Sequence, residues 1–343
     1  MTGEPSRTDP TTTCIAKLSD PLKVGQLLLP IVATPNSASA FAGQGLLTGV
    51  IAIGAVDKSR ATEYQKLLKR DSPIPLLLAS DEEGGTVQRY RALLGALPSA
   101  RRLSKTKTIA EVEDLFADYG EQLKSWGVTL ALAPVADVAG GPGIGSRSFS
   151  DDADRVTAFS RAVAEGYLSS GVTPVYKHFP GHGRASVDTH KALGLTPTLE
   201  EMRKSDLKPF ASLGELAGVA VMVGHLSVPG LTDGAPATVS RSAIDGLLRK
   251  ELGFNGVVIS DALGMGAIAS YTTLETAAVR FVQAGGDVLI LPTLASTSQV
   301  HARLLLAMKK KEISAARLNE SVRRVLEMKG VDPCSVVALK QKA

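Results

Sequence analysis

The chain has 343 residues, of which 44% are hydrophobic, 21% charged and 4% aromatic, and its formal net charge is +4. This is an ordinary globular composition, ample for a sizeable core, and length alone leaves one large domain or two small ones open. Lysines and arginines are spread along the chain without aromatic neighbours, so we expect no nucleic-acid partner. No apolar run reaches the ~18 residues of a membrane-spanning helix, so we expect no transmembrane segment.

The two ends of the chain are expected to be tails. The opening residues are polar and rich in proline and threonine, and we place a flexible N-terminal tail over residues 1–18, a catalytic barrel over 19–335 and a C-terminal tail over 336–343. Cys14 and Cys334 lie at the extremes of the folded region. Since the termini of one domain often lie close together, we favour a disulfide over two free thiols. A disulfide indicates an oxidising compartment, so we expect a secreted or cell-envelope protein whose leader is absent from this chain, with the cytoplasm as the alternative.

Eight apolar segments are predicted to be β-strands, with helical patterns between them. Their hydrophobicity is continuous rather than alternating, which is typical of strands buried on both faces of a parallel sheet. This alternation predicts an α/β fold, a single-domain (β/α)8 barrel of the TIM type. A doubly wound open sheet is the alternative, but no glycine-rich dinucleotide motif follows the first strand. The expected strands are residues 26–32, 49–54, 74–79, 127–134, 171–176, 218–223, 256–259 and 286–291, and the expected helices include 110–126, 155–170, 199–216, 241–252, 273–284 and 314–329.

The most informative motif follows the fifth expected strand. It reads Lys177-His178-Phe179-Pro180-Gly181-His182-Gly183, and Asp188-Thr189-His190 follows closely. The segment places three of the five histidines, a lysine and a carboxylate on a glycine-rich loop. Active sites of (β/α)8 barrels lie on such loops, at the carboxyl ends of the strands.

Other expected strands also end in polar residues. Asp81, Asp137, His225 and Asp261 follow the third, fourth, sixth and seventh strands. Gathered on one rim, they form a constellation able to hold a polyhydroxylated ligand. Taken singly, Asp81 or Asp261 has the alternative role of capping the next helix, and His225 that of a satisfied buried histidine.

These motifs, in this order, resemble single-domain bacterial β-N-acetylglucosaminidases of glycoside hydrolase family 3. The resemblance extends from residue 24 to residue 287. It implies a retaining exo-β-N-acetylglucosaminidase, a β-N-acetylhexosaminidase that cleaves N-acetylglucosaminides such as peptidoglycan fragments by double displacement. It implies no cofactor, no bound metal and a chain that we expect to be a monomer. The matching segments are 81–89, 133–137, 145–149, 177–183, 188–190, 236–240 and 260–265.

The resemblance also implies roles for individual residues. Asp261 is expected to be the nucleophile, and His190, on a mobile loop, the acid/base with Asp188 as its partner. Imidazole titrates near neutral pH, so it can protonate a leaving oxygen and then deprotonate the acceptor. The side chains expected to bind the sugar are Asp81, Arg89, Arg147, Lys177 and His178. Glu82 and Glu83 are given no role, and His182 is expected to shape the loop.

Four other interpretations stay open at this point. In a metal-dependent hydrolase the zinc ligands would come from His178, His182, Asp188, His190 and His225, although their spacing matches no closed ligand set. Lys177 would be a Schiff-base lysine in an aldolase-type barrel. A carbohydrate-binding protein without catalysis is the third alternative. Phosphorolysis, with phosphate in place of water as the acceptor, is the fourth, because an imidazole acid/base is compatible with either acceptor.

Overall fold

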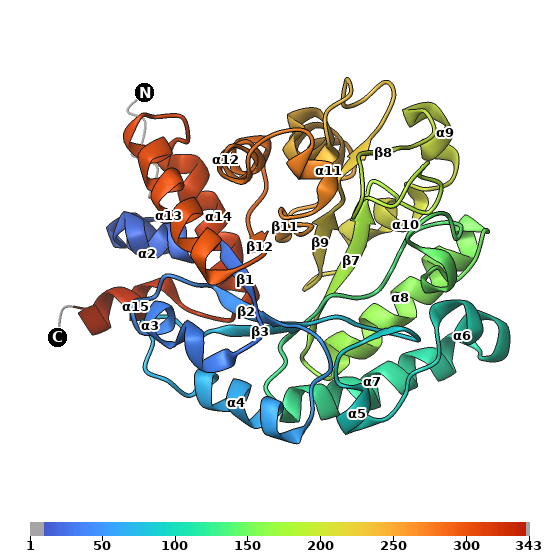
Figure 1. The fold of residues 1–343 in the computed structure, drawn as a ribbon, viewed down its shortest axis with the longest axis horizontal. Coiled ribbons are helices and arrows are strands. Elements are labelled where there is room, and N and C mark those ends of the chain that lie inside the picture. Colours follow the sequence, from blue (N-terminus) through green and yellow to red (C-terminus); the bar gives the residue numbers. More distant parts are fainter. Residues whose placement is uncertain (1–9, 341–343) are drawn as a thin grey trace, which may run out of the picture.

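The computed structural model describes residues 10–340, in which eight parallel strands form a nearly closed barrel surrounded by helices (Figure 1). Neighbouring strands follow the order β11-β9-β7-β6-β3-β2-β1-β12, and a parallel bridge between Ile259 and Val288 joins the two ends of this sheet. The predicted TIM-type, single-domain α/β fold is therefore confirmed. The strands are β1 (Leu28–Val32), β2 (Gly49–Ala52), β3 (Leu77–Ser80), β6 (Leu130–Ala131), β7 (Thr173–Phe179), β9 (Ala220–Val223), β11 (Val258–Ser260) and β12 (Leu289–Leu291).

The helices cover the outside of the barrel, because each presents an apolar stripe to the strands. Capping residues set where the helices start. At the start of α7 the hydroxyl of Thr108 accepts a hydrogen bond from the backbone N–H of Glu111, and the Glu111 carboxylate accepts one from the backbone N–H of Thr108. The longer elements are α4 (Lys58–Leu68), α6 (Ala100–Thr106), α7 (Ile109–Ser125), α8 (Ala153–Ser169), the π-helix η5 (Ser242–Glu251), α12 (Leu274–Ala284), α13 (Leu294–Lys309) and α14 (Ala315–Met328). The shorter ones are α2 (Asp20–Gly25), η1 (Pro35–Ala38), α3 (Ser39–Gly43), α5 (Arg91–Leu94), η2 (Gly145–Arg147), α9 (Leu199–Lys204), α10 (Lys208–Ala211), η3 (Ser212–Glu215), η4 (Ala237–Val239) and α11 (Gly266–Ala269).

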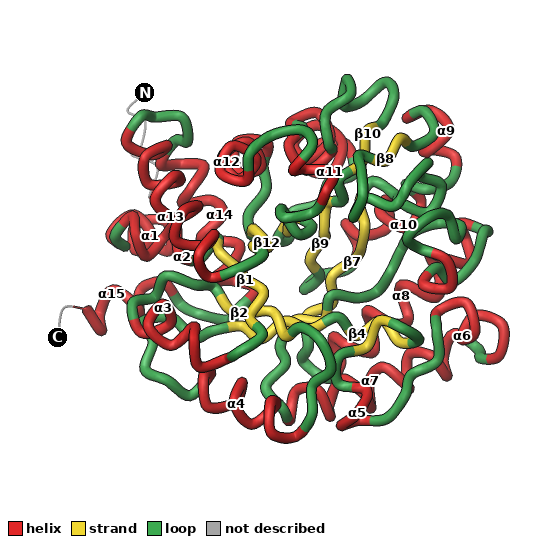
Figure 2. Tube along the Cα trace, in the orientation of Figure 1, coloured by secondary structure: helices red, strands yellow, loops and turns green. Residues whose placement is uncertain are grey.

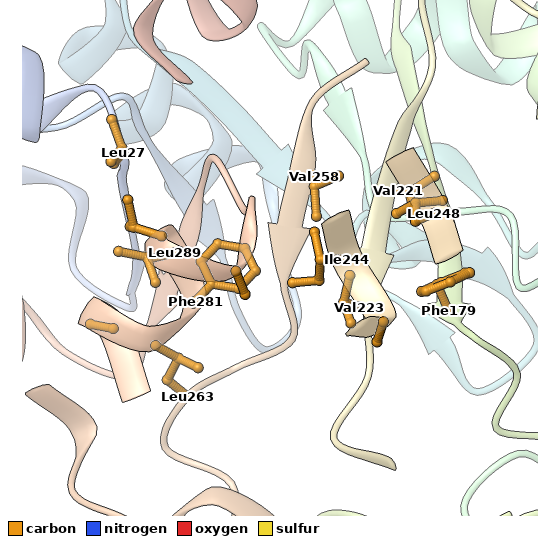
Figure 3. Packing of buried hydrophobic residues seen from close by; sticks show 14 of the residues in the cluster. Leu27, Phe179, Val221, Val223, Ile244, Leu248, Val258, Leu263, Phe281 and Leu289 are labelled. Carbon is orange, nitrogen blue, oxygen red and sulfur yellow. The ribbon is translucent and has the colours of Figure 1, made fainter. Parts of the chain in front are cut away.

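The strands are buried on both faces. One set of side chains fills the barrel interior, including Leu29, Ile51, Leu130 and Ile259. The other set packs against the surrounding helices, as Figure 3 shows for Val221, Val223 and Val258 beside η5 and α12. The other labelled residues of this cluster are Leu27, Phe179, Ile244, Leu248, Leu263, Phe281 and Leu289. This double burial is the physical reason for the continuous hydrophobicity of the strand segments.

The two expected tails differ from the structure where it describes them. Residues Pro10–Lys17 form α1 and Pro333–Lys340 form α15, and the two helices pack together. The predicted disulfide between Cys14 and Cys334 is present, with Cα atoms 5.1 Å apart. Ile15 is buried beside it, so the N-terminal segment is held by apolar packing and a covalent bond rather than free. Residues 1–9 and 341–343 of the expected tails lie outside the described residues. Within the described part, no helix combines the length and apolarity needed to cross a membrane.

Two short ladders stand at the rim of the barrel (Figure 2). One is antiparallel and joins β4 (Glu82–Gly84) to β5 (Val87–Gln88), directly after β3. The other is parallel and joins β8 (Gly194–Leu195) to β10 (Leu226–Ser227). These ladders hold the chain that follows β3 and β7 near the carboxyl ends of the strands, where the predicted site residues lie.

Candidate active site

A cavity of about 320 Å³ opens among the carboxyl ends of the strands. Seven of the eight predicted site residues line it, and the eighth, Asp188, is bonded to one of the seven. Apolar strand residues such as Ile31 and Ile290 form the rest of the wall. A larger cavity of about 380 Å³, near the amino ends of β7, β9 and β11, contains none of the predicted residues. The polar residues of the site cavity are Asp81, Glu83, Arg89, Arg147, Lys177, His178, His190 and Asp261.

Lys177 lies at the centre of the polar cluster. Its ammonium nitrogen is 3.0 Å from a carboxylate oxygen of Asp81 and 2.6 Å from one of Glu83. Burial lowers the pKa of Lys177, but the two carboxylates raise it by more, so the side chain stays protonated. A Schiff-base lysine must react as a neutral amine. The aldolase-type interpretation therefore does not fit this site.

Asp81 connects Lys177 to Arg89. Its second carboxylate oxygen is 2.9 Å from a guanidinium nitrogen of Arg89. Burial raises the pKa of Asp81, but Lys177 and Arg89 together hold it well below its usual range. An ionised carboxylate flanked by two cations can accept hydrogen bonds from one sugar hydroxyl while its neighbours donate to the next.

Glu83 belongs to the site, although the sequence analysis gave it no role. Its carboxylate receives two bonds from the guanidinium of Arg147, at 2.7 and 2.8 Å, besides the contact with Lys177. The sequence did contain a signal for this role. Residues two apart point to the same side of a strand, so Glu83 is expected to face the same way as Asp81. Asp81 and Glu83 accordingly face the cavity, while Glu82 points away from it to Ser80 and Tyr119.

Asp137, at the end of the fourth strand, orients His178. One of its carboxylate oxygens is 2.7 Å from Nδ1 of His178, and the other accepts the backbone N–H groups of His178 and His182. Burial raises the pKa of Asp137, but His178 and these bonds lower it to about 2. The Nδ1–H of His178 therefore donates to Asp137, which leaves Nε2 on the side of Arg147, 3.5 Å away.

Asp261 follows β11 and differs from the other acids of the cavity. One oxygen accepts the backbone N–H of Ala262 at 2.7 Å, and no cation is paired with the carboxylate among the described residues. Burial raises its pKa, but His225, His178, the N–H of Ala262 and Lys177 lower it by more. Burial also lowers the pKa of His225, so this ring is neutral. The lowered pKa of Asp261 is therefore due to His178, the N–H of Ala262 and Lys177. Asp261 is thus an ionised carboxylate with a free oxygen.

His225 does not line the cavity and is a satisfied buried histidine. Its Nε2 donates to the carbonyl oxygen of Ala262 at 3.0 Å, and its Nδ1 lies 2.7 Å from the hydroxyl of Thr238. The ring therefore holds the carbonyl group of Ala262, the residue that follows Asp261. Its role is to support the site rather than to contact a ligand.

His190 lies on the loop between β7 and β8, and 68% of its side chain is exposed. Its Nδ1 is 2.8 Å from the Oδ1 atom of Asp188, and the same oxygen accepts the backbone N–H of His190 at 3.0 Å. Burial raises the pKa of Asp188, but the two hydrogen bonds and the nearby imidazoles together lower it by more. The paired Nδ1 leaves Nε2 of His190 available to the cavity.

His182 shapes the loop, as the sequence analysis expected. Its Nε2 lies 3.0 Å from the hydroxyl of Thr189, the residue between Asp188 and His190, and its ring packs edge-on against His178. The carbonyl oxygens of Thr189 and His190 accept backbone N–H groups at the start of α11. The loop is therefore held from both sides.

The histidines and acids are not arranged as metal ligands. Among the described residues, no three His, Cys, Asp or Glu side chains gather as a metal site requires. His178 and His190 are each committed through Nδ1 to a carboxylate, and His225 to a backbone carbonyl. The ligands proposed for a zinc hydrolase thus serve as separate hydrogen-bonded pairs.

The fold and the cavity define a class of protein. An ionised carboxylate and an imidazole–carboxylate pair face a cavity lined by charged hydrogen-bonding groups, at the carboxyl end of a (β/α)8 barrel. A cavity of this kind suits a polyhydroxylated ligand such as a saccharide, and places the protein in the class of (β/α)8-barrel proteins with a saccharide-sized polar site.

Comparisons identify the family. Residues 21–328 match the glycosyl hydrolase family 3 N terminal domain, and the chain belongs to this family. It is 40% identical over 329 residues to "Beta-hexosaminidase LpqI" of Mycobacterium tuberculosis, covering 93% of this chain and 84% of that protein. It is 36% identical over 278 residues to a "Beta-hexosaminidase" of Xylella fastidiosa, covering 77% and 82%.

Solved structures agree with this assignment. The structure of M. tuberculosis LpqI has a TM-score of 0.89 at 39% identity, covering 95% of this chain and 98% of that one. A glycosyl hydrolase of the same family from Mycobacterium smegmatis has a TM-score of 0.88 at 38% identity, covering 92% and 98%. The chain is thus a family 3 glycoside hydrolase of the β-hexosaminidase group.

Proposed function

We propose that this enzyme releases terminal β-linked N-acetylglucosamine from peptidoglycan fragments or related glycosides by double displacement. Asp261 attacks the anomeric carbon and forms a glycosyl-enzyme ester, and His190, supported by Asp188, first protonates the leaving oxygen and then activates water. The configuration at the anomeric carbon is retained, because it is inverted twice. The observation that carries the proposal is that Asp261 and His190 line one cavity with the charged cluster.

The properties of Asp261 support its role as the nucleophile. The other acids of the cavity are neutralised, since Asp81 and Glu83 each pair with two cations. Asp261 has an ionised carboxylate without such a partner. A carboxylate of this kind can stabilise the positive charge of an oxocarbenium-like transition state and then bond to it.

The pairing of His190 with Asp188 supports the acid/base role. Asp188 fixes the ring so that Nε2 exchanges the proton, and it stabilises the imidazolium form. The exposure of His190 lets the leaving group and water reach the same nitrogen in turn. These are the requirements of a group that acts as acid in one step and base in the next.

The wall of the cavity supports an amino sugar as the substrate. The polar side chains Asp81, Arg89, Arg147, Lys177 and His178 offer acceptors and donors for vicinal hydroxyls. Apolar residues such as Ile31, Met265 and Ile290 offer contacts for a methyl group. The relatives named β-hexosaminidases favour an N-acetylhexosamine, which has both kinds of surface.

The disulfide supports a location outside the cytoplasm. Bonds of this kind persist in oxidising compartments. We therefore place the enzyme among secreted or cell-envelope proteins. Mass measurement after alkylation of the protein isolated without reductant tests this: two unreactive cysteines support the location, and two alkylated cysteines contradict it.

Two substrates with different leaving groups test the acid/base assignment. His190→Ala should lower kcat/KM on an N-acetylglucosamine disaccharide by roughly 100-fold or more, since general acid catalysis contributes this much. On a dinitrophenyl N-acetylglucosaminide, whose leaving group needs no proton, the loss should be much smaller. The matched control is His301→Ala, at a partly exposed histidine outside the cavity. Equal losses on both substrates would contradict the assignment.

The acceptor is decided in the same assay. Water gives N-acetylglucosamine, whereas phosphate gives a sugar phosphate, and an imidazole base is compatible with both. Products measured with and without phosphate separate hydrolysis, which we propose, from phosphorolysis. A phosphate-dependent rate with a sugar phosphate as the main product would replace hydrolysis with the alternative.

A further inference from the structure

We propose that Gly143 is a positioning residue for the acid/base pair and links it to the sugar-binding cluster. It lies on the loop between β6 and α8, which also carries Arg147. This inference rests on the proposed role of Asp188 and His190. It adds that a backbone position in a different loop determines where Asp188 sits.

Two loops interlock beside the cavity. The backbone N–H of Gly141 donates to the carbonyl oxygen of Gly183 at 2.8 Å, which joins the loop after β6 to the loop after β7. A Cβ atom on Gly183 would lie 1.8 Å from the carbonyl oxygen of Val138, and one on Gly141 would lie 2.5 Å from that of Gly183. The two backbones approach so closely that neither position has room for a side chain.

Gly143 makes the contact that matters for chemistry. A Cβ atom there would lie 2.9 Å from Oδ1 and 3.0 Å from Cγ of Asp188. Oδ1 is the atom that holds His190, through both Nδ1 and the backbone N–H. The hydrogen at this position of Gly143 thus faces the oxygen on which the orientation of the imidazole depends.

The carbonyl group of Gly143 is held by Arg147. One guanidinium nitrogen of Arg147 donates to the carbonyl oxygen of Gly143 at 2.8 Å, and the other two nitrogens bind Glu83. Arg147 therefore connects the cavity wall to Gly143, and Gly143 contacts Asp188. A sugar bound against Arg147 stabilises this chain of contacts and with it the position of the acid/base pair.

Gly145 provides a matched control in the same loop. Both glycines have positive φ angles, +80° at Gly143 and +53° at Gly145, so alanine strains both backbones. A Cβ atom on Gly145 meets nothing within 4 Å. The two alanine variants share the strain and differ in the contact with Asp188.

The experiment compares Gly143→Ala with Gly145→Ala on the disaccharide and on the dinitrophenyl N-acetylglucosaminide. We expect Gly143→Ala to lose about 10-fold or more in kcat/KM on the disaccharide and less than about 3-fold in kcat/KM on the activated substrate, the pattern of a displaced acid. The ratio kcat/KM reports the first step, in which the group acts as an acid. Gly145→Ala should lose little on either. Equal losses in the two variants, or a loss that is uniform across the substrates, would overturn the proposal.

A second measurement separates positioning from general damage. In the His190→Ala background, Gly143→Ala should have no further effect, because it acts through the missing imidazole. Additive losses would overturn the proposal. If His190→Ala itself affects both substrates equally, the proposed function fails instead, so the two failures are distinguishable. Gly143→Asn and Gly145→Asn keep the comparison possible if alanine unfolds the loop, since asparagine tolerates positive φ.

Discussion

Glu82 is expected to make stability fall as the pH rises toward neutrality. Its carboxylate is buried on the side of β4 that faces away from the cavity, where it accepts bonds from Ser80, Tyr119 and the backbone N–H groups of Arg89 and Tyr90. Burial raises its pKa from 4.5 to about 7, although these bonds lower it. The native protein therefore keeps a proton that the unfolded chain loses.

The size of the effect follows from the shift. Between pH 4.5 and about 7, the unfolded glutamate releases its proton while the native one retains it. Each pKa unit between the folded and unfolded states corresponds to about 1.4 kcal/mol of unfolding free energy, so this pKa difference contributes about 3 kcal/mol. The stabilising contribution is complete below pH 4.5, decreases through the window and is absent above about pH 7.

Denaturant unfolding of the parent protein and Glu82→Gln between pH 4 and 8.5 tests this. As the pH rises from 4.5 to about 7, the free energy of unfolding of the parent should fall by about 3 kcal/mol relative to that of the variant. Above about pH 7 the difference should stay constant. Glu83→Gln is the matched control. Burial raises the pKa of Glu83, but Lys177 and Arg147 lower it by more, so its stabilising contribution is constant above its ordinary pKa of 4.5 and is lost only below that pH. The difference for Glu83→Gln should therefore stay constant from about pH 5 to 8.5. A flat difference for Glu82→Gln would refute the reasoning.

Three further outcomes are expected. The double variant Cys14→Ser, Cys334→Ser should lose about 5 kcal/mol of unfolding free energy in denaturant, because the disulfide closes nearly the whole chain and a longer loop is stabilised more. Unchanged stability would contradict this constraint. Asp287→Ala should lose roughly 3–5 kcal/mol of unfolding free energy, since it leaves Arg249, Arg317 and Arg324 without their shared buried carboxylate. A loss below ~1 kcal/mol by the same method would show that this ion-pair cluster is dispensable. Glu83→Gln should lower kcat/KM by about 10-fold or more through a misplaced Arg147, and steady-state kinetics equal to those of the parent would exclude this role.

The barrel was predictable because its strands are buried on both faces. Leu29 faces the interior and Leu28 the helices, so the apolar run of β1 is uninterrupted in the sequence. The prediction of one continuous helix over residues 199–216 was wrong, because the structure has three short helices there, α9, α10 and η3. The backbone leaves the helical conformation at Ser205, and Asp206 turns inward to pair with Arg184. A tertiary ion pair of this kind leaves no periodic signal.

The site was predictable to the extent that its residues follow strands. Lys177 lies in the carboxyl-terminal half of β7 and Asp261 directly follows β11, which positions both at the carboxyl ends of the strands. The support around them was not predictable, because Asp137 acts through His178 and Glu83 through Arg147, across 41 and 64 residues of chain. Only the folded barrel shows which acids face a cation and which one is left free.

The role of Asp261 as the nucleophile is tested by identifying the residue that becomes glycosylated. We would incubate the enzyme with a slow activated 2-deoxy-2-fluoro glycoside, measure the intact mass and map the labelled peptide. The account predicts one added sugar, joined as an ester to Asp261, and no label in Asp261→Asn. A label on any other residue, or turnover of an unmodified N-acetylglucosaminide with inverted configuration and no covalent species, would contradict it.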